Sequence, residues 1–271
     1  MAVKIGINGF GRIGRLVFRA AVAQPEKYEI VGINDPFVDL DYMVYMTKYD
    51  SIHGHFDGEV KAENGKLVVN GREVAVYGCM NPEEIPWSEC GAEYIVESTG
   101  VFTTTEACQA HIKGGAKKVV ISAPAGNDLP TIVYSVNEKT LKPSDTVISA
   151  ASCTTNCLAP MADTLNKLAS IEKGFMTTIH AYTGDQMLLD GPHRKGDLRR
   201  ARAGALNIVP NSTGAAKAIG LVIPELAGKL DGAAQRVPTP TGSVTELVAV
   251  CNKTVTADEV NAAMKAAAND S

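Results

Sequence analysis

The sequence predicts an α/β protein that opens with a doubly wound, mostly parallel sheet. Two observations predict this class. Short apolar runs alternate with runs of helical periodicity over the first 152 residues, and a glycine-rich turn joins the first strand-like run to the first helical one. The chain has 271 residues, 45% hydrophobic and 21% charged, which suits two soluble domains. Because the pattern changes after residue 152, we expect domains at 1–152 and 153–271.

Elements of the first domain follow from residue type and spacing. Strands are expected where β-branched and apolar residues cluster between turn residues, and helices where apolar residues recur every three or four positions. The pairs Asn64-Gly65 and Asn70-Gly71 predict hairpin turns in a meander at 59–77. The other expected strands are 3–7, 29–34, 93–98, 117–122, 131–136 and 146–150, and the expected helices are 15–23, 40–48 and 103–113.

The second domain begins with a helical pattern at 153–168. A long polar and basic stretch at 184–205 has no clear period, and a loop of that length is usually functional. The other expected elements are strands at 171–183 and 243–251, a helix at 214–222, and a last helix opened by the capping box of Thr256 and Glu259.

Composition and charge argue against several classes of function. The net charge of −4 disfavours a general nucleic-acid binder, and no apolar run approaches the roughly 20 residues that span a bilayer. No signal-peptide pattern opens the chain. The six cysteines are scattered in a chain too large to need disulfides, which favours reduced thiols in a cytoplasmic protein. We therefore expect no membrane partner and no specific nucleic-acid partner.

A glycine-rich turn follows the first expected strand. Gly9, Gly11 and Gly14 have the spacing Gly-x-Gly-x-x-Gly, which permits a tight turn, close approach of a pyrophosphate, and close packing of helix on strand. Asp35 follows Gly14 by 21 residues, and its carboxylate can accept hydrogen bonds from ribose hydroxyls. This favours NAD over NADP. An ordinary glycine turn is the alternative reading, and FAD is the main rival cofactor.

Cys153 lies among small polar residues at the start of the helix expected at 153–168. A helix N-terminus and a neighbouring imidazole both lower the pKa of a thiol, so Cys153 is a candidate nucleophile. His180 ends a β-branched run and is the candidate base. The alternatives are a packed cysteine and a structural histidine.

The other cysteines and histidines have simpler expectations. Cys157 lies one helical turn after the candidate nucleophile, without further ligands at suitable spacing, so we expect a packed thiol and no metal site. His111 and His193 are expected to face solvent. His53 and His55 are expected to be loop residues.

Seven stretches of the chain resemble phosphorylating glyceraldehyde-3-phosphate dehydrogenase, in the order of that family. The most specific is Ser152-Cys153-Thr154-Thr155-Asn156-Cys157. The resemblance implies a Rossmann-type domain that binds NAD, followed by an α+β catalytic domain with a mostly antiparallel sheet. The seven stretches are 7–15, 98–100, 151–160, 180–186, 199–202, 212–218 and 236–240.

The resemblance also implies a glycolytic oxidoreductase that converts glyceraldehyde 3-phosphate and inorganic phosphate to 1,3-bisphosphoglycerate. Cys153 would attack the aldehyde, and His180 would assist thiolate formation and stabilise the hemithioacetal oxyanion before a thioester forms. Phosphate would then release the product from the thioester.

Binding residues are implied by the same resemblance. Thr183 and Arg236 would hold the substrate phosphate, whereas Ser152, Thr154, Thr213 and Gly214 would hold the attacking phosphate. A homotetramer is implied as well, with the basic loop 193–202 against a neighbouring subunit. The implied NAD contacts are Asn8, Gly9, Phe10, Gly11, Arg12, Ile13, Gly14, Asn34, Asp35, Ser98, Thr99, Gly100, Phe102, Ser122 and Ala123.

One departure from the family and two alternatives remain. Family chains continue beyond the helix of the capping box, and that tail supplies an asparagine for the nicotinamide carboxamide. We expect that the sequence ending at Ser271 is partial. Erythrose 4-phosphate dehydrogenase shares much of the pattern. A secondary surface-binding role, adhesin-like or toward RNA, has no motif in this chain.

Overall fold

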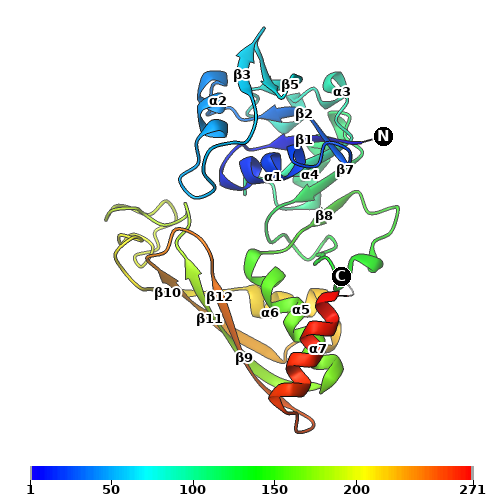
Figure 1. Cartoon of the computed structure of the whole chain (residues 1–271), viewed down its shortest axis with the longest axis vertical. Coiled ribbons are helices and arrows are strands. Elements are labelled where there is room, and N and C mark those ends of the chain that lie inside the picture. Colours follow the sequence, from blue (N-terminus) through cyan, green and yellow to red (C-terminus); the bar gives the residue numbers. More distant parts are fainter. Residues whose placement is uncertain (1, 270–271) are drawn as a thin grey trace. The chain divides into compact units, whose positions relative to one another are not determined.

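The computed structural model describes residues 2–269, which divide into two compact units (Figure 1). The main division falls between Ala151 and Ser152, and the first unit ends there. The segment Ile132–Thr140 belongs to the second unit, which the sequence did not predict.

The predicted doubly wound sheet is confirmed in the first unit. Its strands are β1 (Val3–Asn8), β2 (Tyr28–Asn34), β3 (Val60–Glu63), β4 (Lys66–Val69), β5 (Arg72–Tyr77), β6 (Tyr94–Glu97), β7 (Lys118–Ile121) and β8 (Val147–Ser149). The order is β3-β4-β5-β2-β1-β6-β7-β8, and the strands from β5 to β8 in this order are all parallel. The strand order reverses at β1, where ligands bind in such sheets, outside the carboxyl ends of the strands.

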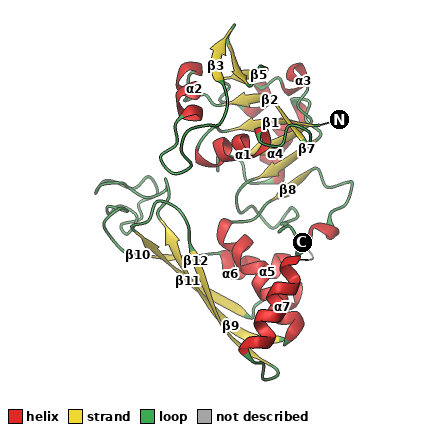
Figure 2. Cartoon of the chain, viewed as in Figure 1, coloured by secondary structure: helices red, strands yellow, loops and turns green. Residues whose placement is uncertain are grey.

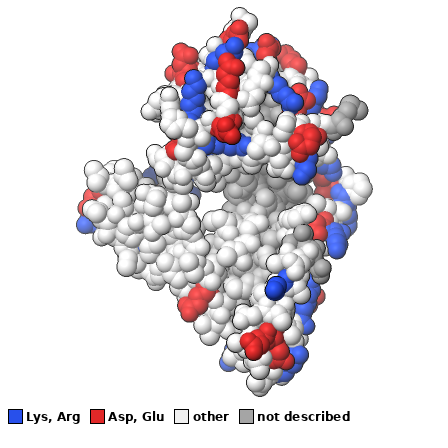
Figure 3. Space-filling view, viewed as in Figure 1, with Lys and Arg blue, Asp and Glu red and all other residues white. Residues whose placement is uncertain are grey.

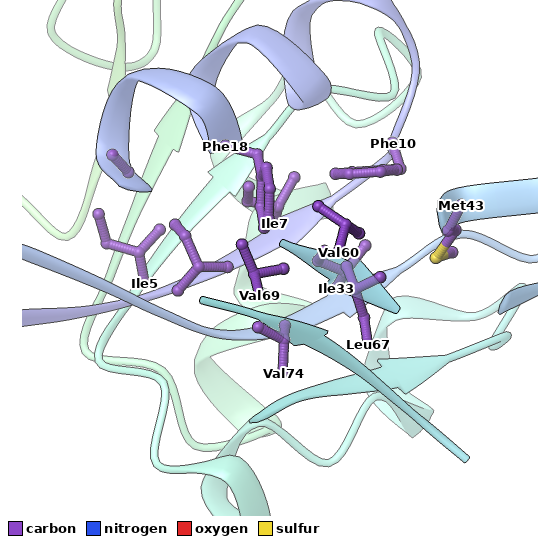
Figure 4. Packing of buried hydrophobic residues seen from close by; sticks show 12 residues of the cluster. Ile5, Ile7, Phe10, Phe18, Ile33, Met43, Val60, Leu67, Val69 and Val74 are labelled. Carbon is purple, nitrogen blue, oxygen red and sulfur yellow. The ribbon is translucent and has the colours of Figure 1, made fainter. Parts of the chain in front are cut away.

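Helices pack against this sheet, and the buried side chains form two hydrophobic clusters. One cluster joins Ile7 and Ile33 of the sheet to Phe18 and Met43 from the first two helices (Figure 4). The other contains Trp87 and further residues from the last two helices. Burying one such side chain stabilises the fold by about 1.5–3 kcal/mol. The helices are α1 (Arg12–Val22), α2 (Leu40–Lys48), α3 (Trp87–Cys90) and α4 (Thr105–Lys113).

The predicted meander and its two turns are confirmed. Asn64 and Asn70 have φ of 51° and 50°, and each is followed by a glycine with positive φ. Two consecutive residues in the left-handed region make the hairpin turn that Asn-Gly pairs favour. The turns join β3 to β4 and β4 to β5 as antiparallel pairs.

The second unit is a four-stranded sheet with helices packed against it. Its elements are α5 (Cys153–Leu168), β9 (Ile171–Ala181), β10 (Val209–Ser212), α6 (Ala215–Val222), β11 (Leu230–Val237), β12 (Val244–Cys251) and α7 (Ala257–Asn269). The order is β10-β11-β9-β12, and two of its three pairings are antiparallel, as expected. Helix α5 packs against β9, β12, α6 and α7. The capping box is confirmed, since Thr256 N–H donates to Glu259 Oε2 at 2.7 Å and Glu259 N–H to Thr256 Oγ1 at 3.2 Å.

Two expectations about elements were wrong or incomplete. The apolar run 131–136 is not a strand: Thr131 forms an isolated bridge with Ser149, and turns follow. The side chain of Asn137 accepts from Val133 N–H at 2.8 Å, which holds the backbone in a turn instead of a ladder. The strands β10 and β11 and the short helix α3 were not predicted from the sequence.

Within residues 2–269, no helix combines the length and apolar character needed to cross a bilayer.

Candidate active site

Cys153 is the first residue of α5 in the second unit. Ser152 caps the helix, and its Oγ accepts from Thr155 N–H at 2.9 Å. The side chain of Cys153 is exposed, while Leu158 and Ala159 of the same helix are buried. The positive end of the helix macrodipole therefore lies at an accessible thiol, where it favours the thiolate.

His180 of β9 approaches this thiol from the sheet. Its Nε2 lies 3.3 Å from Cys153 Sγ, and its Nδ1 lies 2.7 Å from the carbonyl oxygen of Ala181. Because a carbonyl only accepts, Nδ1 carries the hydrogen and the lone pair of Nε2 faces the thiol. Ser243 Oγ accepts from Ala181 N–H at 3.1 Å, which holds the backbone just before the carbonyl that orients the ring.

The contact shifts the pKa of both groups toward proton transfer. The hydrogen bond with His180 lowers the pKa of Cys153, although desolvation of the thiol by surrounding protein atoms opposes that change. The hydrogen bond to Cys153 raises the pKa of His180 against the effect of burial. Both shifts favour the thiolate–imidazolium form, which is the reactive form of a cysteine nucleophile.

Two hydrogen-bond donors lie beside the pair. Arg236 of β11 is in register with His180 of β9, and its Nη1 donates to Thr183 Oγ1 at 2.8 Å. Within the described residues, Arg236 Nε is buried and has no partner. A guanidinium with an unused donor next to a hydroxyl suits an anion such as phosphate.

A further set of polar groups lies at two helix starts in the same unit. Ser152 and Thr154 flank the thiol at the start of α5, and Thr213 and Gly214 precede α6, with Gly214 as its N-cap residue. Thr213 Oγ1 accepts from Ala215 N–H at 3.2 Å. Helices α5 and α6 pack against each other. Free N–H groups at helix starts are suited to bind phosphate.

The expected cofactor residues gather in the first unit at the carboxyl ends of β1, β2, β6 and β7. A Cβ on Gly14 would lie 2.0 Å from the carbonyl oxygen of Gly9, so only glycine allows α1 to start this close to the turn. A Cβ on Gly11 would meet nothing within 4 Å, which leaves open space in front of the N-terminus of α1. Asp35 Oδ2 accepts from Phe10 N–H at 2.8 Å, which ties the end of β2 to the turn. The open space between the glycine turn and the N-terminus of α1 fits a dinucleotide pyrophosphate.

The loop between β9 and β10 contains residues that the sequence reasoning missed. Figure 2 shows the segment as loop, and the ion pairs of Asp185 with Arg200 and Arg194 hold it. Arg200 Nε also donates to Asn211 Oδ1 at 3.0 Å, which joins the loop to β10. The sequence offered one clue to this role of Asp185, because it lies only two residues after the predicted phosphate-binding residue Thr183.

Three expectations about single residues were wrong. His111 is fully buried because Trp87 Nε1 donates to it, and His193 is buried because Lys195 N–H and Asp197 N–H both donate to its Nδ1. Cys157 is exposed instead of packed, because the buried face of α5 is formed by its neighbours. Among residues 2–269, no cluster of three or more histidine, cysteine or acidic side chains could hold a metal ion.

Comparison with known proteins agrees with this geometry. The family description "Glyceraldehyde 3-phosphate dehydrogenase, C-terminal domain" matches residues 152–271, and the description of the NAD binding domain of the same family matches residues 3–105. A glyceraldehyde-3-phosphate dehydrogenase of Clostridium pasteurianum is 62% identical over 268 residues, which cover 99% of this chain and 80% of the relative. One from Streptococcus pyogenes serotype M1 is 61% identical over 272 residues, covering 100% of this chain and 80% of the relative.

The chain belongs to the glyceraldehyde-3-phosphate dehydrogenase family. Membership of the glyceraldehyde-3-phosphate dehydrogenases assigns NAD as the cofactor and a dehydrogenase activity to the chain. The open turn at Gly11 and the start of α1 are consistent with that cofactor.

Proposed function

We propose that this chain catalyses the NAD-dependent oxidative phosphorylation of D-glyceraldehyde 3-phosphate to 1,3-bisphosphoglycerate, a step of glycolysis. The observation that carries the proposal is the 3.3 Å contact between Cys153 Sγ and His180 Nε2 at the start of α5. The names of the relatives in Clostridium pasteurianum and Streptococcus pyogenes support the same reaction. In this proposal residues 1–152 bind NAD and residues 153–271 carry the chemistry.

The chemistry begins with proton transfer from the Cys153 thiol to His180 Nε2. The thiolate forms a carbon–sulfur bond with the aldehyde carbon, and the aldehyde oxygen becomes an oxyanion that the Nε2–H of His180 stabilises. NAD, when bound, would accept a hydride from the carbon of this adduct. Loss of that hydride restores the carbonyl bond and leaves a thioester on Cys153. Inorganic phosphate then attacks the thioester carbonyl, forms the acyl phosphate, and returns Cys153 as a thiolate. A thioester retains energy of oxidation that a free carboxylate would lose.

Two phosphate groups must be held during this sequence. Thr183 and Arg236 hold the phosphate of the substrate, since the guanidinium is a permanent charged anchor. Ser152, Thr154, Thr213 and Gly214 hold the attacking phosphate with hydroxyl and backbone N–H donors. Uncharged donors suit a phosphate that must enter and leave in each cycle.

The strand ends of the first unit hold NAD in this proposal. The turn at Gly11 and the N-terminus of α1 would hold the pyrophosphate, and the Asp35 carboxylate would accept hydrogen bonds from the ribose hydroxyls. The remaining contacts come from the segments after β1, β2, β6 and β7. They comprise Asn8, Gly9, Phe10, Arg12, Ile13, Gly14, Asn34, Ser98, Thr99, Gly100, Phe102, Ser122 and Ala123.

An assay of NADH formation tests the proposal. NADH should form with glyceraldehyde 3-phosphate, NAD and phosphate together, and turnover should stop when phosphate is omitted. The Cys153→Ser variant should bind NAD and fail to turn over. Turnover without phosphate, or by Cys153→Ser, would contradict the mechanism. A higher specificity for erythrose 4-phosphate than for glyceraldehyde 3-phosphate would contradict the proposed substrate.

We propose a homotetramer, and one face of the sheet in the second unit supports self-association. The register places Phe175 opposite Val248 and Ile179 opposite Val244, so these four side chains share a face. They are 49%, 65%, 37% and 66% exposed respectively, whereas Met176 on the other face is buried. Figure 3 shows few charged side chains over these strands. We propose that a second copy of the chain covers this face, because an apolar patch of this kind marks an interface.

Light scattering measures this self-association. The chain should have a mass four times its own in solution, and Phe175→Asp should lower the mass. Asn261→Asp, which adds the same charge on the exposed helix α7, should leave the mass unchanged. A wild-type chain that is monomeric at micromolar concentration would contradict self-association, and a dimer would contradict the tetramer.

We propose the cytoplasm as the compartment of this enzyme. Its reactive thiol must stay reduced, and all six cysteines are free thiols in the structure. Fractionation of cells that express a tagged chain should place the NADH-forming activity in the cytoplasm, and activity confined to an oxidising compartment would contradict this.

A further inference from the structure

A buried carboxylate lies at the edge of the first unit's sheet where three strands end together. Asn34, Asn8 and Glu97 are the last residues of β2, β1 and β6, and the register pairs Asn8 with Asn34 on one side and with Glu97 on the other. Glu97 is 1% exposed. Because a buried charge is costly without partners, the hydrogen bonds around Glu97 determine what this edge can do.

The carboxylate of Glu97 is bound entirely by donors from neighbouring segments. Its Oε2 accepts from Asn8 Nδ2 at 2.6 Å and contacts His111 Nε2 at 3.0 Å. Its Oε1 accepts from the backbone N–H of Thr99 at 2.8 Å and from the hydroxyl of Thr99. Asn8 Oδ1 in turn accepts from Asn34 Nδ2 at 2.8 Å. Glu97 therefore joins the end of β1 to the segment after β6, and Asn8 extends the network to the end of β2.

The direction of the bond from His111 is fixed by Trp87. Indole Nε1 of Trp87 is a donor only, and it lies 3.1 Å from His111 Nδ1, so Nδ1 holds the lone pair and the hydrogen is on Nε2. That hydrogen points at Glu97. Trp87 and His111 are both fully buried. A hydrogen on Nδ1 would oppose the indole N–H, so the hydrogen bond runs from His111 Nε2 to Glu97.

The anchored segment supports the glycine turn directly. Gly9 has a φ of +91°, and a Cβ there would lie 2.8 Å from the backbone nitrogen of Thr99. Ser98 Oγ donates to the carbonyl oxygen of Gly9 at 2.7 Å. The position of Thr99, which Glu97 holds, therefore limits where the turn after β1 can lie.

We propose that Glu97 is a positioning residue for the cofactor site, held in place by His111 and Trp87. Its carboxylate sets the spacing of the strand ends and of the glycine turn before any ligand arrives. None of these three residues is among the proposed NAD contacts, so each acts through Asn8 and Thr99. The inference rests on the placement of NAD at these strand ends under the proposed function.

Glu97→Gln is the first test, because Gln has nearly the same shape and replaces one acceptor by a donor. The NH2 group of Gln would face either Asn8 and His111 or the two donors of Thr99. We expect NAD to bind about tenfold more weakly to the full chain, because donors to a buried charged group are left without an acceptor. Without NAD, amide hydrogen exchange at Thr99 should rise about tenfold, while exchange in β7 stays unchanged. Alkylation of Cys153 without NAD should not change.

His111 gives a matched pair of variants that keeps Glu97 intact. His111→Gln places an N–H donor near the position of Nε2, whereas His111→Met has similar length and no donor. We expect His111→Gln to bind NAD within about threefold of wild type and His111→Met to bind about tenfold more weakly. Ile95→Val removes a buried methylene from β6 without touching the network and is the control for general loosening. It should bind NAD as wild type does.

The outcomes separate this inference from the proposed function. If Glu97→Gln and His111→Met bind NAD like wild type while Asp35→Ala binds it weakly, Glu97 has no positioning role. If Asp35→Ala also binds NAD like wild type, the placement of NAD at these strand ends is wrong, and the inference is wrong with it. Equal loss of NAD binding in His111→Gln, His111→Met and Ile95→Val would show loosening of the core instead of positioning.

Discussion

The imidazole Nε2 of His180 lies 3.3 Å from Cys153 Sγ, while Nδ1 of the same ring faces the carbonyl oxygen of Ala181 at 2.7 Å. This arrangement fixes the tautomer and leaves Nε2 to receive the thiol proton. Both residues belong to one unit of the chain, where the start of α5 and the end of β9 position them. The proposed nucleophile and its proposed base therefore come from the same unit.

The pH dependence of alkylation checks this pair. The hydrogen bond with His180 lowers the pKa of Cys153, so the thiolate persists to lower pH than in an ordinary thiol. The rate of reaction with iodoacetamide should fall only below that lowered pKa. His180→Gln should shift the fall to higher pH and reduce the rate near neutral pH about tenfold, the factor that one pKa unit represents. An unchanged pH profile would exclude His180 from activating the thiol.

Two glycines of the turn after β1 should respond differently to alanine. Gly11→Ala should leave the melting temperature near wild type, because its Cβ meets nothing within 4 Å, yet weaken NAD binding about tenfold by blocking the pyrophosphate. Gly14→Ala should destabilise the fold as well, because its Cβ would lie 2.0 Å from Gly9 O. Calorimetry of folding and of NAD binding measures both effects. Tight NAD binding by Gly11→Ala would mean that the pyrophosphate lies elsewhere.

The anion site beside the pair should act mainly on substrate affinity. Arg236→Lys keeps the positive charge but loses the planar guanidinium, whose several N–H groups can donate to Thr183 and to a phosphate together. The KM for glyceraldehyde 3-phosphate should therefore rise about tenfold. Steady-state kinetics against the substrate and against inorganic phosphate separate the two anion sites. An effect on KM for inorganic phosphate alone would reverse the proposed assignment. Thr183→Ser, which retains the hydroxyl, is the matched control.

Acid sensitivity of the first unit should depend on Asp50. Burial would raise the pKa of its carboxyl, but backbone N–H groups of His53 and Ile52 and the guanidinium of Arg12 lower it well below its usual range. A depressed pKa stabilises the fold above the unfolded-state pKa, about 3.9 for Asp, and the stabilisation is lost as the pH falls below it.

Asp50→Asn should therefore cost about 1–2 kcal/mol near neutral pH and progressively less in acid. Urea unfolding at several pH values measures the difference, with the exposed Asp57→Asn as control. A penalty that does not depend on pH would mean that the carboxylate charge is not involved.

Much of the fold could be predicted because its signals are local. The two Asn-Gly turns, the helix at Cys153–Leu168 and the capping box of Thr256 each depend on neighbours in sequence. The strand predicted at residues 131–136 was wrong because a side chain competes with the strand pairing. That run has strand composition, but the side chain of Asn137 competes for the backbone of Val133.

The site could be predicted only as a set of residue types. Spacing along the chain indicated Cys153 and His180, but not that Ser243 supports the peptide next to the histidine, since 62 residues separate it from Ala181. Burial of His111 was missed for a similar reason. Its partners Glu97 and Trp87 lie on other elements, and a histidine near a helix end usually faces solvent.

Intact-protein mass spectrometry tests the central proposal most directly. The chain is mixed with glyceraldehyde 3-phosphate and NAD in the absence of phosphate, and the adduct is mapped by digestion. The account predicts one acyl group per chain, attached to Cys153 as a thioester and released when phosphate is added. Cys153→Ser should show no adduct. NADH formation with no adduct on Cys153, or with the acyl group on another residue, would contradict the proposed role of Cys153.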